Sequence, residues 1–157
     1  MTDPVTTPLS AEDQRTTGDV LQTALVDLID LSLIGKQAHW TVIGPHFRSL
    51  HLALDELVDA ARGFTDDVAE RATAIGVAPD GRADTVASTT VAKSFGAGWS
   101  PDTGVIDAIV DNLAGVIERL RNGIAITEDT DPVTQDLLIA VTARLEQLHW
   151  MWQAQRG

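Results

Sequence analysis

The sequence predicts an all-α protein, a four-helix bundle with one long crossover between the second and third helices. Apolar residues recur at helical spacing in four long stretches of the chain. Short turns separate the first two stretches and the last two, whereas a link of about 23 residues joins the middle two. A link of that length can run the length of a bundle, so a single crossover is the expected topology.

The first two helices are predicted on either side of the Gly44-Pro45 turn. The first runs from about Thr17 to Ile43, and its leucines are so frequent that we expect it to be largely buried. The second runs from about His46 to Ile75, and Gly76 ends it. Residues 1–15 are expected to form a polar N-terminal tail.

The second helical pair follows the long link, which has room for one short helix. Ser100-Pro101 is a helix start, with Ser100 as the predicted N-cap and Pro101 in the first turn. This third helix is expected to end near Ile126. Asp131-Pro132 repeats the start signal, and the fourth helix is predicted to reach about Gln155.

Length and composition predict a single domain over residues 1–157. The chain is 44% hydrophobic, which is enough for one compact core. It has no run of eighteen apolar residues and a polar N-terminus, so neither a membrane span nor a signal peptide is expected. The absence of cysteine excludes disulfides, thiolate metal sites and cysteine nucleophiles, and it fits a cytoplasmic location.

The charge balance favours cations as ligands. Asp and Glu number 23 and Lys and Arg 11, so the net charge is −12 at pH 7. Such a field attracts cations and repels phosphate backbones. Many acidic proteins bind nothing in particular, so the arrangement of the acids has to decide.

A polar stripe follows one side of the second helix. Spacings of three and four residues place its members within about a 100° arc; they are His51, Asp55, Asp59, Arg62, Asp66 and Glu70. The simplest interpretation is a solvated helix face in an interaction module without chemistry. Histidine favours a metal site instead: His39 lies five residues before Gly44 and His51 six after Pro45, so an antiparallel hairpin brings both imidazoles to the same height.

Helical rise separates this stripe into two patches. Asp55 and Asp66 are eleven residues apart, which is roughly 16 Å along a helix. Ligands of one metal or metal pair must lie within a few ångströms of each other, so one chain cannot complete the site. A two-fold dimer with antiparallel second helices would bring His39, His51 and Asp55 of one copy to Asp66 and Glu70 of the other. Spacing leaves iron, manganese and zinc open.

These residues and their neighbours resemble the signature of the Dps proteins, the mini-ferritins of the ferritin-like superfamily. The matching residues are Lys36-Gln37-Ala38-His39-Trp40, Gly44, Phe47, Leu50-His51, Asp55-Glu56, Asp66 and Ala69-Glu70-Arg71. The resemblance implies a ferritin-like bundle and a shell of twelve subunits that oxidises Fe(II), preferably with hydrogen peroxide. It also implies storage of the ferric mineral and protection against oxidative stress.

The resemblance also assigns residues. It makes His39, His51, Asp55, Asp66 and Glu70 the ferroxidase ligands, divided between two subunits as helical rise requires, with zinc able to replace iron there. Trp40 is similar to the tryptophan that family members carry beside the iron site, although a core or interface role is an equal alternative.

Two further acidic features are weighed against structural roles. Asp129, Asp131 and Asp136 are candidates for the iron pores that the family builds on three-fold axes, and helix capping is the alternative. Glu146 and His149 form a single Glu-x-x-His pair, whereas larger di-iron proteins need two, so we expect both to be structural.

The chain departs from the family in its tails. Many Dps proteins bind DNA through lysine-rich tails, but residues 1–14 contain no lysine or arginine and the last five residues contain one arginine. Direct DNA binding is therefore expected to be weak or absent. The alternative is a nucleoid-binding Dps protein whose main role is DNA condensation and protection.

Overall fold

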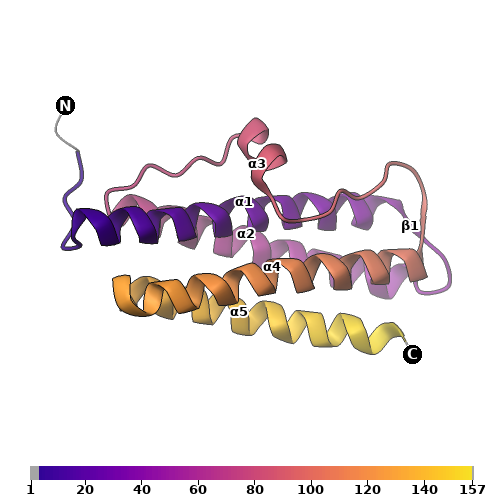
Figure 1. Cartoon of the computed structure of the whole chain (residues 1–157). Helices are drawn as coiled ribbons and strands as arrows, with labels where there is room; N and C mark the ends of the chain where they lie inside the picture. Colours follow the sequence, from indigo (N-terminus) through magenta and orange to yellow (C-terminus); the bar gives the residue numbers. More distant parts are fainter. Residues whose placement is uncertain (1–3, 157) are drawn as a thin grey trace.

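The computed structural model describes residues 4–156, in which four long helices lie side by side as a bundle (Figure 1). The long helices are α1 (Ala11–Thr41), α2 (Phe47–Ala74), α4 (Asp102–Thr130) and α5 (Pro132–Gln153). The short elements are β1 (Val42–Ile43), α3 (Ala83–Thr89), β2 (Ser100–Pro101) and the 3-10 helix η1 (Ala154–Arg156). The predicted all-α bundle is confirmed. Within the described residues, no helix combines the length and the apolar character that a bilayer span needs.

The bundle consists of two antiparallel hairpins joined by the predicted crossover. The first hairpin is α1 and α2, and the second is α4 and α5 (Figure 1). The connection from residue 75 to residue 101 returns along the outside of α1 and carries α3 in its middle. Because this connection runs the length of the molecule, α4 starts at the end of the bundle where α1 finishes.

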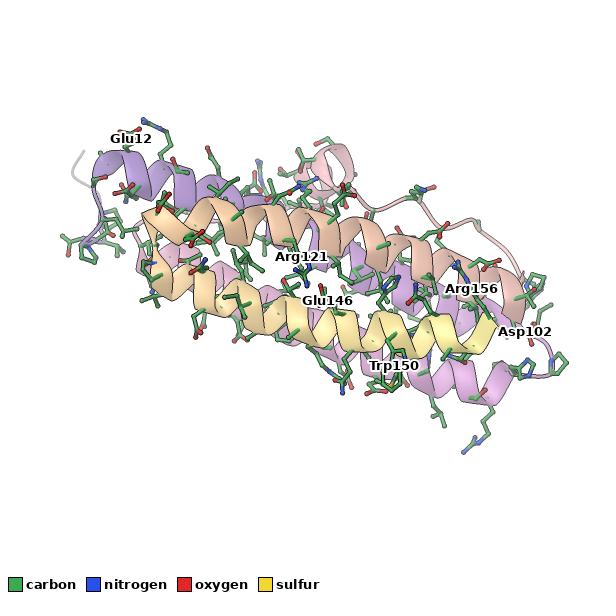
Figure 2. The ribbon with its side chains drawn as sticks, turned by 60° about the horizontal axis from the view of Figure 1, so that its bottom comes forward. Glu12, Asp102, Arg121, Glu146, Trp150 and Arg156 are labelled. Atoms are coloured by element: carbon green, nitrogen blue, oxygen red, sulfur yellow. The ribbon has the colours of Figure 1, made fainter. Side chains whose placement is uncertain are left out.

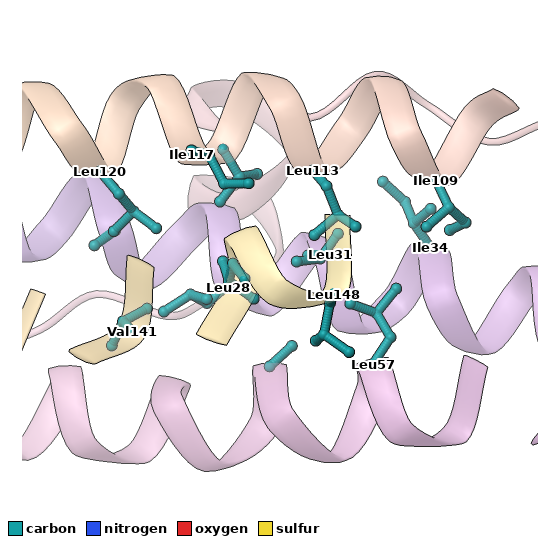
Figure 3. Packing of buried hydrophobic residues seen from close by; sticks show 14 of the residues in the cluster. Leu28, Leu31, Ile34, Leu57, Ile109, Leu113, Ile117, Leu120, Val141 and Leu148 are labelled. Carbon is teal, nitrogen blue, oxygen red and sulfur yellow. The ribbon is translucent and has the colours of Figure 1, made fainter. Parts of the chain in front are cut away.

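Leucine, isoleucine and valine from all four long helices fill the space between them. Leu28 and Leu31 of α1, Leu57 of α2, Leu113 of α4 and Leu148 of α5 meet in this core (Figure 3). Each is at most 2% exposed, and burying such a side chain contributes about 1.5–3 kcal/mol. The core holds the two hairpins in one rigid relation.

A glycine lets α1 and α2 approach closely near the end of the bundle that carries the histidines. A Cβ added at Gly35 would lie 2.8 Å from Cγ2 of Val58. Only a residue without a side chain fits there, and the small separation of the helix axes keeps the last turns of α1 within reach of the first turns of α2.

The first helix begins earlier than predicted. Ser10 is its N-cap, since the Ser10 side chain accepts a hydrogen bond from the N–H of Asp13 at 3.1 Å. Gln14 then donates to the carbonyl oxygen of Ile75 at 2.9 Å, which ties this turn to the end of α2. Residues 11–15 thus belong to α1, and the polar tail stops at Ser10 because a cap and a tertiary contact stabilise the extra turns.

The start of α4 also differs from the prediction. Ser100 was expected to cap this helix, but Ser100 and Pro101 pair in parallel with Val42 and Ile43 as a two-residue strand. The helix begins at Asp102. Pairing with β1 takes the backbone of Ser100 out of the capping position.

Asp102 connects the start of α4 to the turn between α1 and α2. Its carboxylate accepts hydrogen bonds from the backbone N–H and the Nδ1 of His46, at 3.1 and 2.9 Å. These bonds hold the pKa of Asp102 below its usual range. His46 lies in the turn before α2, and these bonds fix that turn to the second hairpin.

The crossover is attached to α1 at two points. Gln22 and the backbone of Asp80 exchange two hydrogen bonds, at 2.8 and 2.9 Å. Farther along, the buried carboxylate of Asp27 accepts the N–H of Val91 at 2.9 Å and lies 3.2 Å from the Arg119 guanidinium of α4. These contacts explain how a long connection with one short helix stays ordered.

Candidate metal half-site on the first hairpin

The last turn of α1 and the first turns of α2 bring two imidazoles together. His39 and His51 stack with ring centroids 3.6 Å apart and planes 18° from parallel. His39 is buried and His51 is half-buried. The two rings stand side by side at the same height of the hairpin, as the spacing around Gly44-Pro45 predicts.

Main-chain carbonyls orient both rings. Nδ1 of His39 lies 2.8 Å from the carbonyl oxygen of His51, and Nδ1 of His51 lies 2.9 Å from the carbonyl oxygen of His39. A carbonyl oxygen only accepts hydrogen bonds, so each neutral ring carries its proton on Nδ1. The lone pair is then on Nε2 of each ring, which is the form that binds a metal ion.

A carboxylate lies next to the histidine pair. Oδ1 of Asp55 is 3.4 Å from Nδ1 of His39 and accepts a hydrogen bond from Nζ of Lys36 at 2.6 Å. The Lys36 hydrogen bond, aided by the nearby histidines, holds the pKa of Asp55 below its usual range. Asp55 is therefore an anion with free lone pairs beside two imidazoles.

Lys36 has a place at this site that the sequence interpretation did not assign. It lies three residues before His39, one helical turn away, so the two side chains share a side of α1. That spacing was available in the sequence, but a lysine one turn from a ligand is usually solvent-exposed and gave no reason to pair it with Asp55.

Aromatic side chains border the half-site. The Phe47 ring centroid lies 5.1 Å from that of His51. Trp40, next to His39, is 63% exposed. The alternative that Trp40 is a core aromatic is wrong for the single chain, and its exposure leaves the predicted role beside a metal site or a role in a subunit interface.

The second predicted patch lies farther along α2 and is not joined to the first. Asp66 and Glu70 are exposed, and neither forms a hydrogen bond or ion pair with another described residue. Within residues 4–156, no three His, Asp or Glu side chains are close enough together to hold a metal ion. The structure thus contains two separate halves of the predicted ligand set on each chain.

Asp131 has a structural role and is withdrawn from the pore candidates. Its side chain is 4% exposed and accepts hydrogen bonds from the Thr134 N–H and hydroxyl as the N-cap of α5. Nη2 of Arg71 lies 2.6 Å from the same carboxylate. Burial raises the pKa of Asp131, but the hydrogen bonds from Thr134 and Arg71 outweigh it and hold the pKa below its usual value. Asp129 and Asp136 are exposed and stay predicted pore residues.

The isolated Glu-x-x-His pair is engaged between helices. Glu146 accepts a hydrogen bond from Nε of Arg121 across the α4–α5 contact (Figure 2). This ion pair gives Glu146 the structural role that was expected. His149 is half-buried, and its Nε2 has no hydrogen-bond partner among the described residues.

A helical bundle with one long crossover, whose first hairpin carries two imidazoles and a carboxylate side by side, is the arrangement expected of the ferritin-like class of proteins. The family model described as the ferritin-like domain matches residues 18–157. The DNA protection during starvation protein of Mycolicibacterium smegmatis is 35% identical over 153 residues, covering 93% of this chain and 80% of the relative. The chain belongs to the Dps family of ferritin-like proteins.

Other comparisons agree on the fold and add a relative with a different name. The solved Mycobacterium smegmatis Dps in its tetragonal form has a TM-score of 0.93 at 34% identity, covering 99% of this chain and 94% of that one. DpsA14 from Streptomyces coelicolor has a TM-score of 0.92 at 33% identity, over 99% and 93% of the two chains. The fine tangled pili major subunit of Haemophilus ducreyi is 36% identical over 136 residues, or 87% of this chain and 72% of that relative.

Proposed function

We propose that this protein is a ferroxidase and iron store that oxidises Fe(II) with hydrogen peroxide and keeps the ferric mineral in a hollow shell of twelve subunits. Membership of the Dps family is consistent with iron handling and DNA protection in general. The observation that carries the specific proposal is the pair of stacked imidazoles whose Nε2 atoms are left free, with the Asp55 carboxylate 3.4 Å from Nδ1 of His39.

The proposed site is completed by a second copy of the chain. Asp55 and Asp66 are about 16 Å apart along α2, too far to share a metal ion within one chain. In a two-fold dimer with antiparallel α2 helices, Asp66 and Glu70 of the partner subunit face His39, His51 and Asp55. Each dimer then has two complete sites.

The proposed reaction moves electrons from iron to peroxide. Two Fe(II) ions lose one electron each, and one hydrogen peroxide molecule accepts both electrons together with two protons. Its O–O bond breaks, giving two water molecules and two Fe(III) ions. The negatively charged carboxylates stabilise the higher charge of Fe(III). The neutral Nε2 atoms coordinate Fe(II) without adding further negative charge. Consuming peroxide in this way avoids hydroxyl radicals.

Oxidation of Fe(II) by peroxide in the wild type, His39→Ala and Glu70→Ala tests the site. We expect each substitution to slow the initial rate by about 10- to 100-fold, because a ligand is lost from every site. Zn(II), which cannot be oxidised, should inhibit the wild type by occupying the same ligands. Glu118→Ala, an exposed change on α4, is the control and should leave the rate unchanged.

Mixing the two impaired variants before assembly tests sharing between subunits. A mixed dimer has one site that lacks both ligands and one that lacks neither. If the chains pair at random, about a quarter of all sites are complete, and the rate should return to roughly a quarter of the wild-type value. Equal rates in all variants would refute the site, and impaired variants that never recover on mixing would refute its division between subunits.

A further inference from the structure

The polar stripe of α2 contains two oppositely charged side chains that the iron site does not use. Asp59 and Arg62 lie between the two ligand patches. Both are exposed, and neither forms an ion pair or side-chain hydrogen bond with another described residue. Seven of the other ten lysines and arginines form ion pairs within the chain, so the unpaired Arg62 beside Asp59 needs a separate explanation.

The positions of these two residues are symmetric about the same point as the ligands. His51 lies nine residues before Ala60 and Glu70 nine after Ala61. Asp55 lies five before Ala60 and Asp66 five after Ala61. A two-fold axis passing between Ala60 and Ala61 therefore places His51 opposite Glu70 of the partner subunit, and it places Asp55 opposite Asp66 of the partner subunit.

Asp59 lies one residue before Ala60 and Arg62 one residue after Ala61, so both are equally distant from the same axis. In the register that completes the iron sites, Asp59 faces Arg62 of the partner subunit, and the contact occurs twice. All the residues concerned share one side of α2, within about a 100° arc. From this symmetry and charge complementarity we propose that reciprocal Asp59–Arg62 ion pairs across the two-fold axis hold two copies of this chain in the iron-binding register.

The proposal rests on the proposed function, since the register is the one that brings the two ligand patches together. A shift of α2 against its partner by one helical turn would separate the ligands by about 5.4 Å. The same shift would also separate Asp59 from Arg62 of the partner subunit and so break both contacts. The pairs thus stabilise the one register in which the metal site is complete.

Exposed apolar residues on the same hairpin give a second copy of the chain further surface to cover. Leu33 and Trp40 of α1 and Leu52 of α2 are each more than half exposed. Leu33 and Trp40 line one hollow beside the crossover, and neighbouring exposed apolar side chains of this kind are typical of surfaces that another protein covers. Apolar contact stabilises the pairing without specifying its register, and the charges specify the register.

Charge reversal tests the proposal without any need for iron. Asp59→Arg makes both contacts of a homodimer arginine against arginine, and Arg62→Asp makes both aspartate against aspartate. We expect each variant alone to have a dimer dissociation constant raised at least about tenfold, because like charges are brought together at an interface. Native mass spectrometry and light scattering measure the assemblies, and circular dichroism checks that the helices are intact.

A mixture of the two variants separates the contact between subunits from effects within each helix. In a mixed dimer, the introduced arginine faces the introduced aspartate at one contact, and the native Asp59 faces the native Arg62 at the other, so both contacts are attractive again. We expect mixed assemblies with equal numbers of each chain and little of either homodimer. The two variant chains differ in mass, so mass spectrometry distinguishes these species. Like charges three residues apart within one helix remain in both chains, so mixing cannot relieve that effect. Arg15→Asp, an exposed change far from the stripe, is the charge-matched control for Arg62→Asp.

Two results would overturn the proposal: single variants that assemble like the wild type, or weakened variants that do not associate preferentially when mixed. Failure of this proposal is distinct from failure of the iron site. If His39→Ala and Glu70→Ala lose oxidation but charge reversal has no effect, only the ion pairs are refuted. If charge reversal behaves as expected but the ligand variants oxidise iron normally, the ferroxidase site is refuted and the pairing stands.

Discussion

Asp27 is an acidic side chain placed where ionisation is unfavourable. It is 1% exposed on α1, and its partners are the Val91 N–H, the Thr90 hydroxyl and the Arg119 guanidinium, with Asp30 one turn away. Burial raises the pKa of Asp27 above its ordinary value of 3.8, although these hydrogen bonds and Arg119 act in the opposite direction. The folded protein therefore binds the proton of Asp27 more tightly than the unfolded chain does.

This shift predicts how stability depends on pH. A raised pKa means that the contribution of Asp27 is fully present below pH 3.8 and is lost as the pH rises through the raised pKa. The variant Asp27→Asn carries an amide at this position and has no charge to bury. We expect urea unfolding between about pH 4 and pH 7 to show the wild type losing stability relative to Asp27→Asn. A difference that changes in favour of the wild type over this range would contradict the prediction.

At the scale of helices, close packing depends on glycine at one crossing. A Cβ added at Gly123 of α4 would lie 2.7 Å from Cγ1 of Val20 on α1. We expect Gly123→Ala to lower the free energy of unfolding by about 1–3 kcal/mol, because α1 and α4 must move apart.

A matched change on the same helix provides the control. A Cβ at Gly115 would meet no atom within 4 Å, so Gly115→Ala should raise the free energy of unfolding by about 0.5–1 kcal/mol through helix propensity alone. Thermal unfolding of the two variants measures the difference. Equal effects of the two substitutions would mean that the α1–α4 contact tolerates expansion.

The sequence predicted the four long helices because their apolar periodicity reflects the burial of one side of each. It predicted the ends less well, because ends depend on tertiary contacts. Ser100 has the residue type of an N-cap, but pairing with Val42 uses its backbone in a strand. Residues 11–15 lack a strong apolar pattern, and their helix depends on the Ser10 cap and on Gln14 reaching α2.

The candidate site shows the same limit. The height of His39 and His51 followed from counting residues around a turn, whereas the hydrogen bonds to main-chain carbonyls and the Lys36–Asp55 contact need coordinates. The Asp131-Pro132 start signal marked Asp131 as a cap in the sequence, but only the structure shows that its carboxylate is buried beside Arg71 while Asp129 is exposed.

Over the whole molecule, few cations are free to meet a polyanion. Of the 11 lysines and arginines, seven form ion pairs with carboxylates of the same chain. One of the seven is Arg156 near the C-terminus, which lies 2.9 Å from Asp107 and 3.5 Å from Asp111 on α4 (Figure 2). The last arginine of the sequence is thus held by acids of the bundle.

DNA binding is accordingly predicted to be weak. A gel shift with plasmid DNA should show no retardation at about 0.15 M salt and at most slight retardation at low salt, because few phosphates can be neutralised. The substitution Arg156→Ala should leave the retardation of the DNA unchanged. Complexes that survive moderate salt would contradict the prediction and would favour the alternative in which DNA condensation is the main role.

The reciprocal hydrogen bonds of His39 and His51 have a consequence for how such a protein can diverge. Both rings are aimed by carbonyl oxygens of the peptide backbone, which every amino acid supplies equally. Mutations can therefore replace most of the surrounding side chains without turning either imidazole, provided that the hairpin keeps its close helix spacing. The orientation of the two imidazoles is inherited with the fold, so a lineage can change much of its sequence while both rings keep the same orientation.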